Sequence, residues 1–162
     1  MTTGKESANG RDALPAWPDR ETPALRHALR TLSPVECFDL LEPGGVGRVA
    51  FTSPADEIMI LPVNFAMTGK TIIFRTAPDT LLAVYANAKV SFEADRFDDA
   101  LHEGWSVLVH GHAHKVTGER DVKHLEDGTR LEPWAAGARD VYVRIAPTRI
   151  SGRRIAPAGA HG

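Results

Sequence analysis

Three histidines stand at alternate positions in His110-Gly111-His112-Ala113-His114. Residues two apart on a strand share one face, and neighbouring imidazoles on such a face can bind zinc or a similar ion. The alternative is a polar outer face of a barrel strand. The residues that would then face the core are Trp105, Val107, Val109, Gly111 and Ala113. Since no carboxylate or further histidine is obviously placed nearby, we favour the outer face and expect no metal site.

A second group of polar residues lies at the end of the run TIIFRTAPDT. Arg75 and Thr76 end a predicted strand, and Thr80 stands at a predicted helix start. Arginine offers a bidentate fork, threonine a hydroxyl, and a helix start free N–H groups with a favourable dipole. Together they could hold a phosphate. A structural ion pair for Arg75 and a plain helix cap at Thr80 are the alternatives.

Several other chemistries are absent from the sequence. It contains no GxSxG around a serine and no HExxH, which argues against the hydrolases and metalloproteases that carry these motifs. Cys37 is the only cysteine, so an intramolecular disulfide and a cysteine-based zinc site are excluded, which favours a reducing compartment. The Gly-rich run PGGVGR follows a helix and opens a strand, the reverse of a phosphate loop, and is predicted to be a turn.

The bulk composition is that of one globular domain. The chain has 162 residues, of which 43% are hydrophobic and 25% charged, with a formal charge of −2. So small a charge makes binding to nucleic acid or to an anionic membrane surface an unlikely function class. No stretch resembles a secretion signal or is long enough to span a bilayer, so we expect a cytoplasmic protein.

The elements that must position these groups are mostly strands. Residues 1–30 lack periodicity and are predicted to be a flexible arm, with order beginning at a capping box formed by Ser33 and Glu36 and a helix to about Glu42. Strands are predicted over 46–52, 58–67, 71–76, 90–94, 105–116 and 141–145, with an edge segment over 147–155. The arm from Ile58 to Met67 is apolar nearly throughout, which predicts a strand buried on both faces.

The remaining segments are predicted to be short helices and loops. Helices are expected over 80–88 and 120–127, and an acidic loop joins the strands on either side of residues 94–104. This order predicts a mainly β protein with short helices, a small antiparallel barrel over residues 31–156 and a disordered tail over 157–162.

Five ordered pieces of the sequence together resemble a known family. They are GGVGRVAF, ILPVNFAM, TIIFRTAPDTLLA, GWSVLVHGHA and VRIAPTRISGRRI. In this order they resemble the pyridoxamine 5′-phosphate oxidase-like family of flavin-binding split barrels, especially its actinobacterial-type branch, over roughly residues 33–155. The resemblance implies a six-stranded antiparallel split β-barrel, a homodimer, and FMN lying between the subunits.

The resemblance also implies which residues would hold the flavin. Pro62, Val63 and Asn64 would line the isoalloxazine ring, and Arg75, Thr76 and Thr80 would surround the phosphate. Trp105 and Ser106 would contact the flavin from the following strand. No residue stands out as a general acid or base, so the catalytic residues are unknown.

One departure from the family pattern concerns the phosphate. Where related sequences commonly have a lysine, this chain has Leu81, which removes a charge-assisted contact of about 1.5 to 3 kcal/mol. We therefore expect an FMN-dependent oxidoreductase of unknown substrate. The alternatives are a reductase that uses the deazaflavin F420 and a non-enzymatic flavin- or haem-binding protein in which His110, His112 or His114 is a ligand.

Overall fold

The computed structural model describes residues 27–84, 86–128, 131 and 139–157. Within these residues, seven strands and three helices follow one another. The strands are β1 (His27–Leu32), β2 (Gly45–Thr52), β3 (Ile58–Thr68), β4 (Thr71–Thr76), β5 (Lys89–Asp98), β6 (Glu103–Lys115) and β7 (Val141–Pro157). The helices are α1 (Pro34–Leu41), α2 (Leu81–Val84) and α3 (Glu119–Gly128). Among these residues, no helix is long and apolar enough to cross a bilayer.

Six of the strands close into a ring. The sheet order is β1-β7-β4-β3-β2-β5-β6, and a further pairing of β6 with β7 joins the two sides. All pairings are antiparallel. The predicted six-stranded antiparallel barrel is therefore confirmed, and β1 adds a seventh strand outside the ring.

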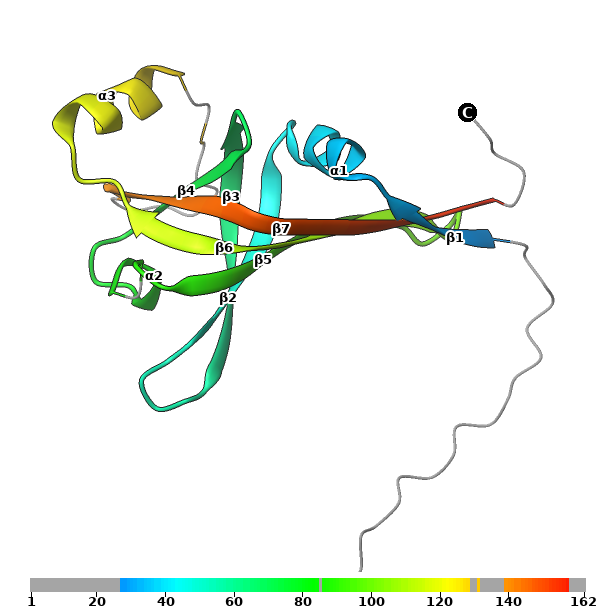
Figure 1. Cartoon of the computed structure of the whole chain (residues 1–162), viewed down its shortest axis with the longest axis horizontal. Coiled ribbons are helices and arrows are strands. Elements are labelled where there is room, and N and C mark those ends of the chain that lie inside the picture. Colours follow the sequence, from blue (N-terminus) through cyan, green and yellow to red (C-terminus); the bar gives the residue numbers. More distant parts are fainter. Residues whose placement is uncertain (1–26, 85, 129–130, 132–138, 158–162) are drawn as a thin grey trace, which may run out of the picture.

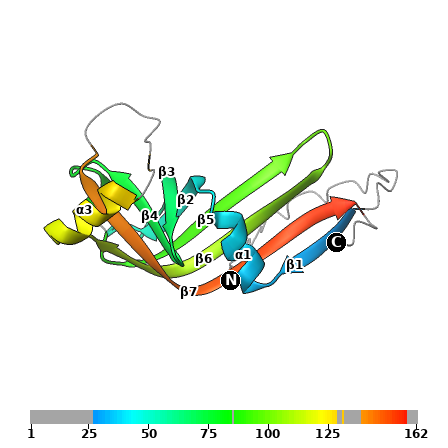
Figure 2. The ribbon, with the colours of Figure 1, turned by 90° about the horizontal axis from the view of Figure 1, so that it is seen from above.

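The pairing between β2 and β5 is the weakest point of the ring. Only the residues of β2 from Arg48 to Ala50 have partners on β5. Beyond that point the hairpin formed by β2 and β3 runs steeply away from β5 and β6, as Figure 1 shows. The β5–β6 hairpin and the second half of β7 extend away from the region where β2, β3 and β4 gather (Figure 2). The barrel is thus split and carries a flat extension.

Strand β7 is shared between the barrel and this extension. Its first residues, Val141–Ile145, pair with β4, its last residues pair with β1, and β6 runs beside most of its length. The sequence analysis predicted a strand ending at Ile145 and a separate edge segment, which is wrong. The second half of β7 is covered on one side by β1 and on the other by β6.

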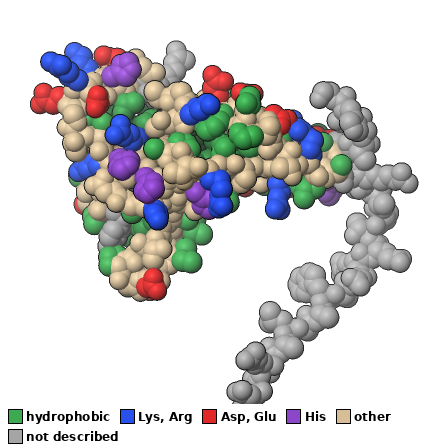
Figure 3. Space-filling model, viewed as in Figure 1, with side chains coloured by type: hydrophobic (Ala, Val, Ile, Leu, Met, Phe, Trp, Pro, Cys, Tyr) green, Lys and Arg blue, Asp and Glu red, His purple; other side chains and the backbone are tan. Residues whose placement is uncertain are grey.

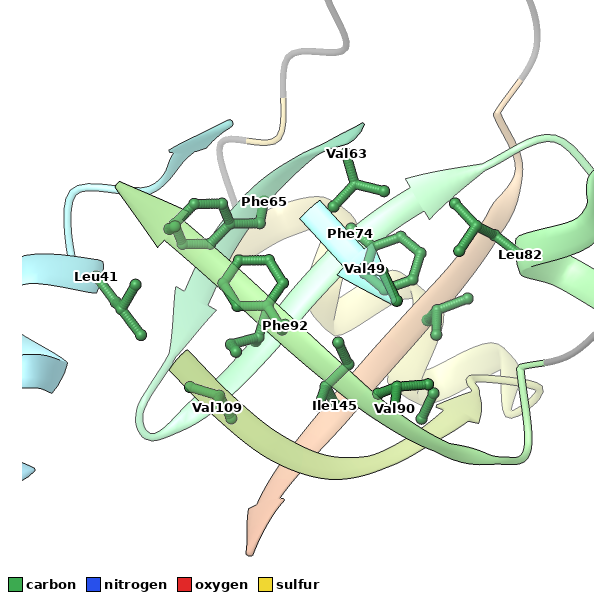
Figure 4. Close-up of a cluster of buried hydrophobic side chains, with 14 of the residues drawn as sticks. Leu41, Val49, Val63, Phe65, Phe74, Leu82, Val90, Phe92, Val109 and Ile145 are labelled. Atoms are coloured by element: carbon green, nitrogen blue, oxygen red, sulfur yellow. The ribbon is translucent and has the colours of Figure 1, made fainter. Parts of the chain in front are cut away.

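The core fills the barrel and is mainly aliphatic and aromatic. Phe65 of β3 and Phe92 of β5 meet edge to face, with ring centroids 4.9 Å apart (Figure 4). Gly47 leaves the space that the Phe92 ring occupies. Alternation on β6 is as predicted, since Val107, Val109 and Ala113 are buried whereas His112 and His114 are exposed.

Helix α1 covers the inner face of the extension. The predicted capping box is present: the Glu36 N–H donates to Ser33 Oγ at 3.3 Å, and the Ser33 N–H donates to Glu36 Oε2 at 2.8 Å. Cys37 and Leu41 are fully buried beneath the helix. Burial, with Glu36 adding to it, raises the pKa of the Cys37 thiol, so this cysteine is an inert core residue.

Three expectations about local structure are wrong. Residues 27–32, which precede the helix cap, are not an irregular arm but form β1, because they pair with the end of β7 across the sheet. Strand β5 continues to Asp98, and β6 begins at Glu103, so most of the expected acidic loop is a hairpin. Helix α2 has only four residues, and its buried side chain is Leu82, whereas Leu81 and Val84 are exposed. The rest of the predicted arm and tail lies outside the described residues.

Strand β3 is also exposed on one face, contrary to expectation. Met59, Leu61, Val63 and Phe65 face the core, but Ile58 and Ile60 are 78% and 62% exposed. The segment before Phe65 pairs only with β2, since β4 is too short to reach it. The outer face of β3 therefore presents an apolar strip to its surroundings.

Candidate functional site

Thr76 and Thr80 lie together, as the sequence analysis expected. Thr76 is 2% exposed, and its Oγ1 lies 2.6 Å from Thr80 Oγ1. The Thr80 hydroxyl also donates to the Ala77 carbonyl at 2.8 Å and accepts from the Ala83 N–H at 3.3 Å. Within one chain these hydroxyls therefore act as the cap of α2.

Arg75 points to the opposite face of β4 from Thr76, because successive strand residues face opposite sides. Its Nε donates to the Arg139 carbonyl at 2.7 Å, its Nη2 lies 3.9 Å from Asp140 Oδ1, and its guanidinium lies 5.0 Å from the Tyr142 ring centroid. Burial raises the pKa of Tyr142, and the Arg75 charge opposes this shift. The side chains of Arg75 and Thr76 are therefore not brought to one point.

Arg139, whose carbonyl accepts the Arg75 hydrogen bond, carries a buried donor of its own. The Nε of Arg139 is buried and has no hydrogen-bond partner among the residues that the structure describes. A buried donor without a partner is costly.

Pro62 and Asn64 share the outer face of β3, and Val63 faces the core. Val63 is 7% exposed and belongs to the main core cluster, so its side chain cannot touch a ligand outside the barrel. Pro62 pairs with Arg48 of β2 and is exposed, and Asn64 pairs with Val46. Of this predicted trio, only Pro62 and Asn64 can present side chains to a flavin ring.

Trp105 and Ser106 divide in the same way. Trp105 packs against the core cluster from the inner face of β6, whereas Ser106 points to the outer face with Pro62 and Asn64. Ser106 lies three strands from β3, or roughly 14 Å at the usual strand spacing. The predicted cofactor residues thus occupy both faces of the sheet.

Sequence reasoning missed three arginines beside Trp105. Strand register pairs Arg96 of β5 with Trp105, Trp105 with Arg154 of β7, and Arg154 with Arg30 of β1. Directly paired residues point to the same face, so the Trp105 side chain stands between those of Arg96 and Arg154 on one face of the sheet. We call this set the Arg-Trp row.

Only one arginine of the Arg-Trp row is neutralised by a carboxylate in the described part of the chain. Arg30 Nη1 lies 2.7 Å from Glu36 Oε1, whereas Arg96 and Arg154 form no ion pair there. Like charges paired across strands are unfavourable unless an anion lies between them. An aromatic surface flanked by such cations fits a planar ring that carries a phosphate. The register of four strands, β1, β5, β6 and β7, was needed to find this row.

A charge network joins β2 to β5 on the outer face of the sheet. Arg48 Nη1 lies 3.0 Å from Glu93 Oε2 and 3.1 Å from Asp95 Oδ1. The hydrogen bonds that Arg48 donates to Asp95 and to Glu93 raise the pKa of Arg48. Partial burial, with the nearby Asp95 charge, raises the pKa of Glu93 despite its bond to Arg48. At Glu93 burial therefore outweighs the hydrogen bond from Arg48, which contacts both carboxylates.

The three histidines lie on the outer face of β6, as predicted for a polar strand face. The rings of His112 and His114 stack with centroids 6.4 Å apart, and His110 Nδ1 lies 2.9 Å from Ser91 Oγ. Within the described residues, no three histidine, cysteine or acidic side chains are grouped closely enough to hold a metal ion.

The sequence matches a known protein family and is similar to a protein from Mycobacterium tuberculosis. A family model described as pyridoxamine 5′-phosphate oxidase matches residues 33–154. The uncharacterized protein Rv0080 from Mycobacterium tuberculosis is 32% identical over 142 residues, which cover 84% of this chain and 91% of that protein.

Two solved structures are similar to the whole barrel. The FAD binding protein from Mycobacterium smegmatis is 38% identical with a TM-score of 0.64, over 76% of this chain and 96% of that one. A candidate pyridoxamine 5′-phosphate oxidase from Corynebacterium glutamicum is 33% identical with a TM-score of 0.69, over 80% and 95% of the two chains. Flavin-binding proteins therefore stand among its structural neighbours.

Proposed function

The chain belongs to the pyridoxamine 5′-phosphate oxidase family, and from this premise we propose that it is an FMN-binding oxidoreductase. The match covers residues 33–154, and a solved neighbour with 38% identity is named as binding FAD. The observation that carries the proposal is the Arg-Trp row, in which Trp105 lies between two arginines without carboxylate partners in the described chain. A flavin needs both an aromatic contact and a phosphate contact.

Two sets of residues would hold the cofactor. Pro62 and Asn64 would contact the ring from the outer face of β3, and Arg75 would lie near the phosphate, while Thr76 and Thr80 cap α2. Trp105 with Arg154 would contact the cofactor from β6 and β7. When bound, a flavin supplies hydride transfer at N5, and the protein's residues orient it and exclude water.

We further propose that the cofactor lies between two copies of the chain. Within one chain Trp105 is on the inner face of the sheet and Pro62 on the outer face, so a single flavin cannot contact both side chains. Two copies remove this conflict if the outer face of one meets the Arg-Trp row of the other. The exposed apolar strip on β3 supports such a contact.

Because Leu81 carries no charge, the positive charge that balances a phosphate must come from other residues. This side chain is 42% exposed at the start of α2, where a lysine is common in related sequences. Arg154 and Arg75 would supply the missing positive charge in this chain.

The test is flavin titration of the purified protein, followed by absorption and flavin fluorescence, with FMN and FAD run in parallel. Arg154→Gln is expected to weaken FMN binding about ten-fold or more, because a charge-assisted contact is lost. Arg153→Gln is the matched control, since Arg153 is the neighbouring, exposed residue on the opposite face. We expect its affinity within about two-fold of the wild type. A protein that takes up neither flavin, or equal losses in the two variants, would contradict the proposal.

A further inference from the structure

A groove of about 570 Å³ lies on the outer face of the barrel and is lined by residues of β2, β3, β5, β6 and β7. Its volume is in the range of small-molecule sites, about 300 to 1,000 Å³. One wall is apolar and includes Ala50 and Ile58. Its polar lining consists of Thr52, Lys89, Ser91, His110, His112 and Thr148.

His110 is held in this groove by two separate hydrogen bonds. Its Nδ1 lies 2.9 Å from Ser91 Oγ on the neighbouring strand, and its carbonyl accepts from Thr148 Oγ1 at 3.0 Å. Thr148 belongs to a bulge in β7, where the register with β6 shifts between His110 and Gly111. Bulges commonly re-aim side chains beside functional sites. The Ser91 bond orients the ring, the Thr148 bond holds the backbone that carries it, and Nε2 has no partner among the described residues.

The charge around the groove is positive. Lys89 pairs in register with His112, directly beside the Ser91–His110 pair, and forms no ion pair within the described chain. No aspartate or glutamate lines the groove. The nearest acidic side chains on these strands belong to Glu93, which Arg48 engages, and to Glu57 in the turn of the hairpin. In Figure 3 the histidine, lysine and arginine side chains gather over β5 and β6 above the hairpin.

From this arrangement we propose that the groove binds a small organic oxyanion, a carboxylate or a phosphate monoester. Lys89 supplies the countercharge, His110 Nε2–H donates a hydrogen bond when Ser91 Oγ donates to Nδ1, and Ile58 contacts the apolar part of the ligand. The site is separate from the Arg-Trp row, which lies on the other face of the sheet. The inference therefore does not depend on flavin binding.

The experiment is a titration of the isotope-labelled full-length protein, without added flavin, followed by backbone amide shifts. The probes are benzoate and phenyl phosphate, with neutral benzyl alcohol for comparison. We expect saturable shifts at Lys89, Ser91 and His110 with at least one anion and a dissociation constant on the order of 1 mM. A response to benzoate alone identifies a carboxylate site, and a response to phenyl phosphate alone identifies a phosphate site.

Variants separate this site from general surface charge. Lys89→Gln and His110→Asn are each expected to weaken anion binding about five-fold, the asparagine keeping a polar group near Ser91 while removing Nε2. The controls are Lys115→Gln and His114→Asn, which change exposed residues of the same strand outside the groove. Absence of shifts with either anion, equal binding of benzyl alcohol, or equal weakening by the controls would overturn the proposal.

Discussion

At the scale of single residues, the side chains that matter most are those whose direction the strand pleat decides. Arg75 and Thr76 are neighbours in sequence but face opposite sides of β4, and the same holds for Trp105 and Ser106. Residues that are adjacent in sequence therefore contribute side chains to opposite faces of the sheet. Arg153 and Arg154 also face opposite sides of the sheet, so Arg153→Gln can serve as the control for Arg154→Gln.

The capping carboxylate of α1 makes stability depend on pH. The Ser33 N–H, and after it the Arg30 guanidinium, lowers the pKa of Glu36 from 4.5 to about 2. Because the folded-state value is the lower one, this stabilisation is complete above about pH 4.5 and is lost as the pH falls through about 2. Glu36→Gln should therefore have a lower melting temperature than the wild type at neutral pH.

The difference between the two proteins should shrink across that acidic window, as measured by thermal unfolding at a series of pH values. Glu36 lies at the surface, so we expect a small effect that also falls with added salt. A difference in melting temperature that stays constant throughout the window would show that the carboxylate charge is not responsible.

At the scale of elements, helix α1 depends on a close approach to β7. A Cβ built on Gly152 would lie 2.7 Å from Cys37 Sγ, 2.9 Å from Leu32 Cδ1 and 3.1 Å from the Ser106 carbonyl. These atoms belong to α1, β1 and β6, so the helix, the added strand and the extension all meet at one glycine.

Gly152→Ala is accordingly expected to destabilise the protein by about 1 to 3 kcal/mol through overpacking. Chemical denaturation measures this change. Gly128→Ala is the matched control, since nothing lies within 4 Å of a Cβ there, and its stability should be unchanged or slightly higher. An unchanged Gly152→Ala variant would mean that α1 does not pack as described.

Much of the local structure could be predicted from sequence because local chemistry decides it. The side chains of Ser33 and Glu36 determine the capping box of α1. The alternation of buried and exposed side chains along β6 follows from the pleat of the strand. The turn of the β3–β4 hairpin is set by Gly69, whose φ is 57°. The exposed face of β3 was missed because an apolar run looks the same whether its second face meets the core or another molecule.

The part of the candidate site that depends on pairing between distant strands could not be predicted from the sequence. The Arg-Trp row joins residues 30, 96, 105 and 154, and no local pattern relates them. The family resemblance pointed to Trp105 but not to its arginine neighbours. The face on which Arg75 lies, by contrast, could have been found from the period of two along β4.

At the scale of the whole molecule, the open question is assembly. Ile60 is 62% exposed on the outer face of β3 in a segment paired only with β2. Burial of such a side chain at an interface contributes about 1.5 to 3 kcal/mol, and a lysine there would have to be desolvated. We therefore predict that Ile60→Lys weakens the proposed dimer.

Light scattering coupled to size exclusion measures this directly. The wild type is expected to elute as a dimer and Ile60→Lys to shift toward monomer at the same protein concentration. Val35→Lys on α1 changes an equally exposed residue, 68% accessible, and should leave the mass unchanged. A monomeric wild type, or equal dissociation in both variants, would contradict the predicted interface.

Strand β7 has a consequence for how the chain reaches this structure. It is made after every other strand of the ring, and it pairs with β1, β4 and β6, whose residues precede it by up to about 130 positions. Ring closure therefore waits for the last strand, and such non-local pairing folds slowly, in roughly milliseconds to seconds. Until then β4 and β6 present unpaired edges, so the nascent or unfolding chain is most prone to aggregation at these two strands.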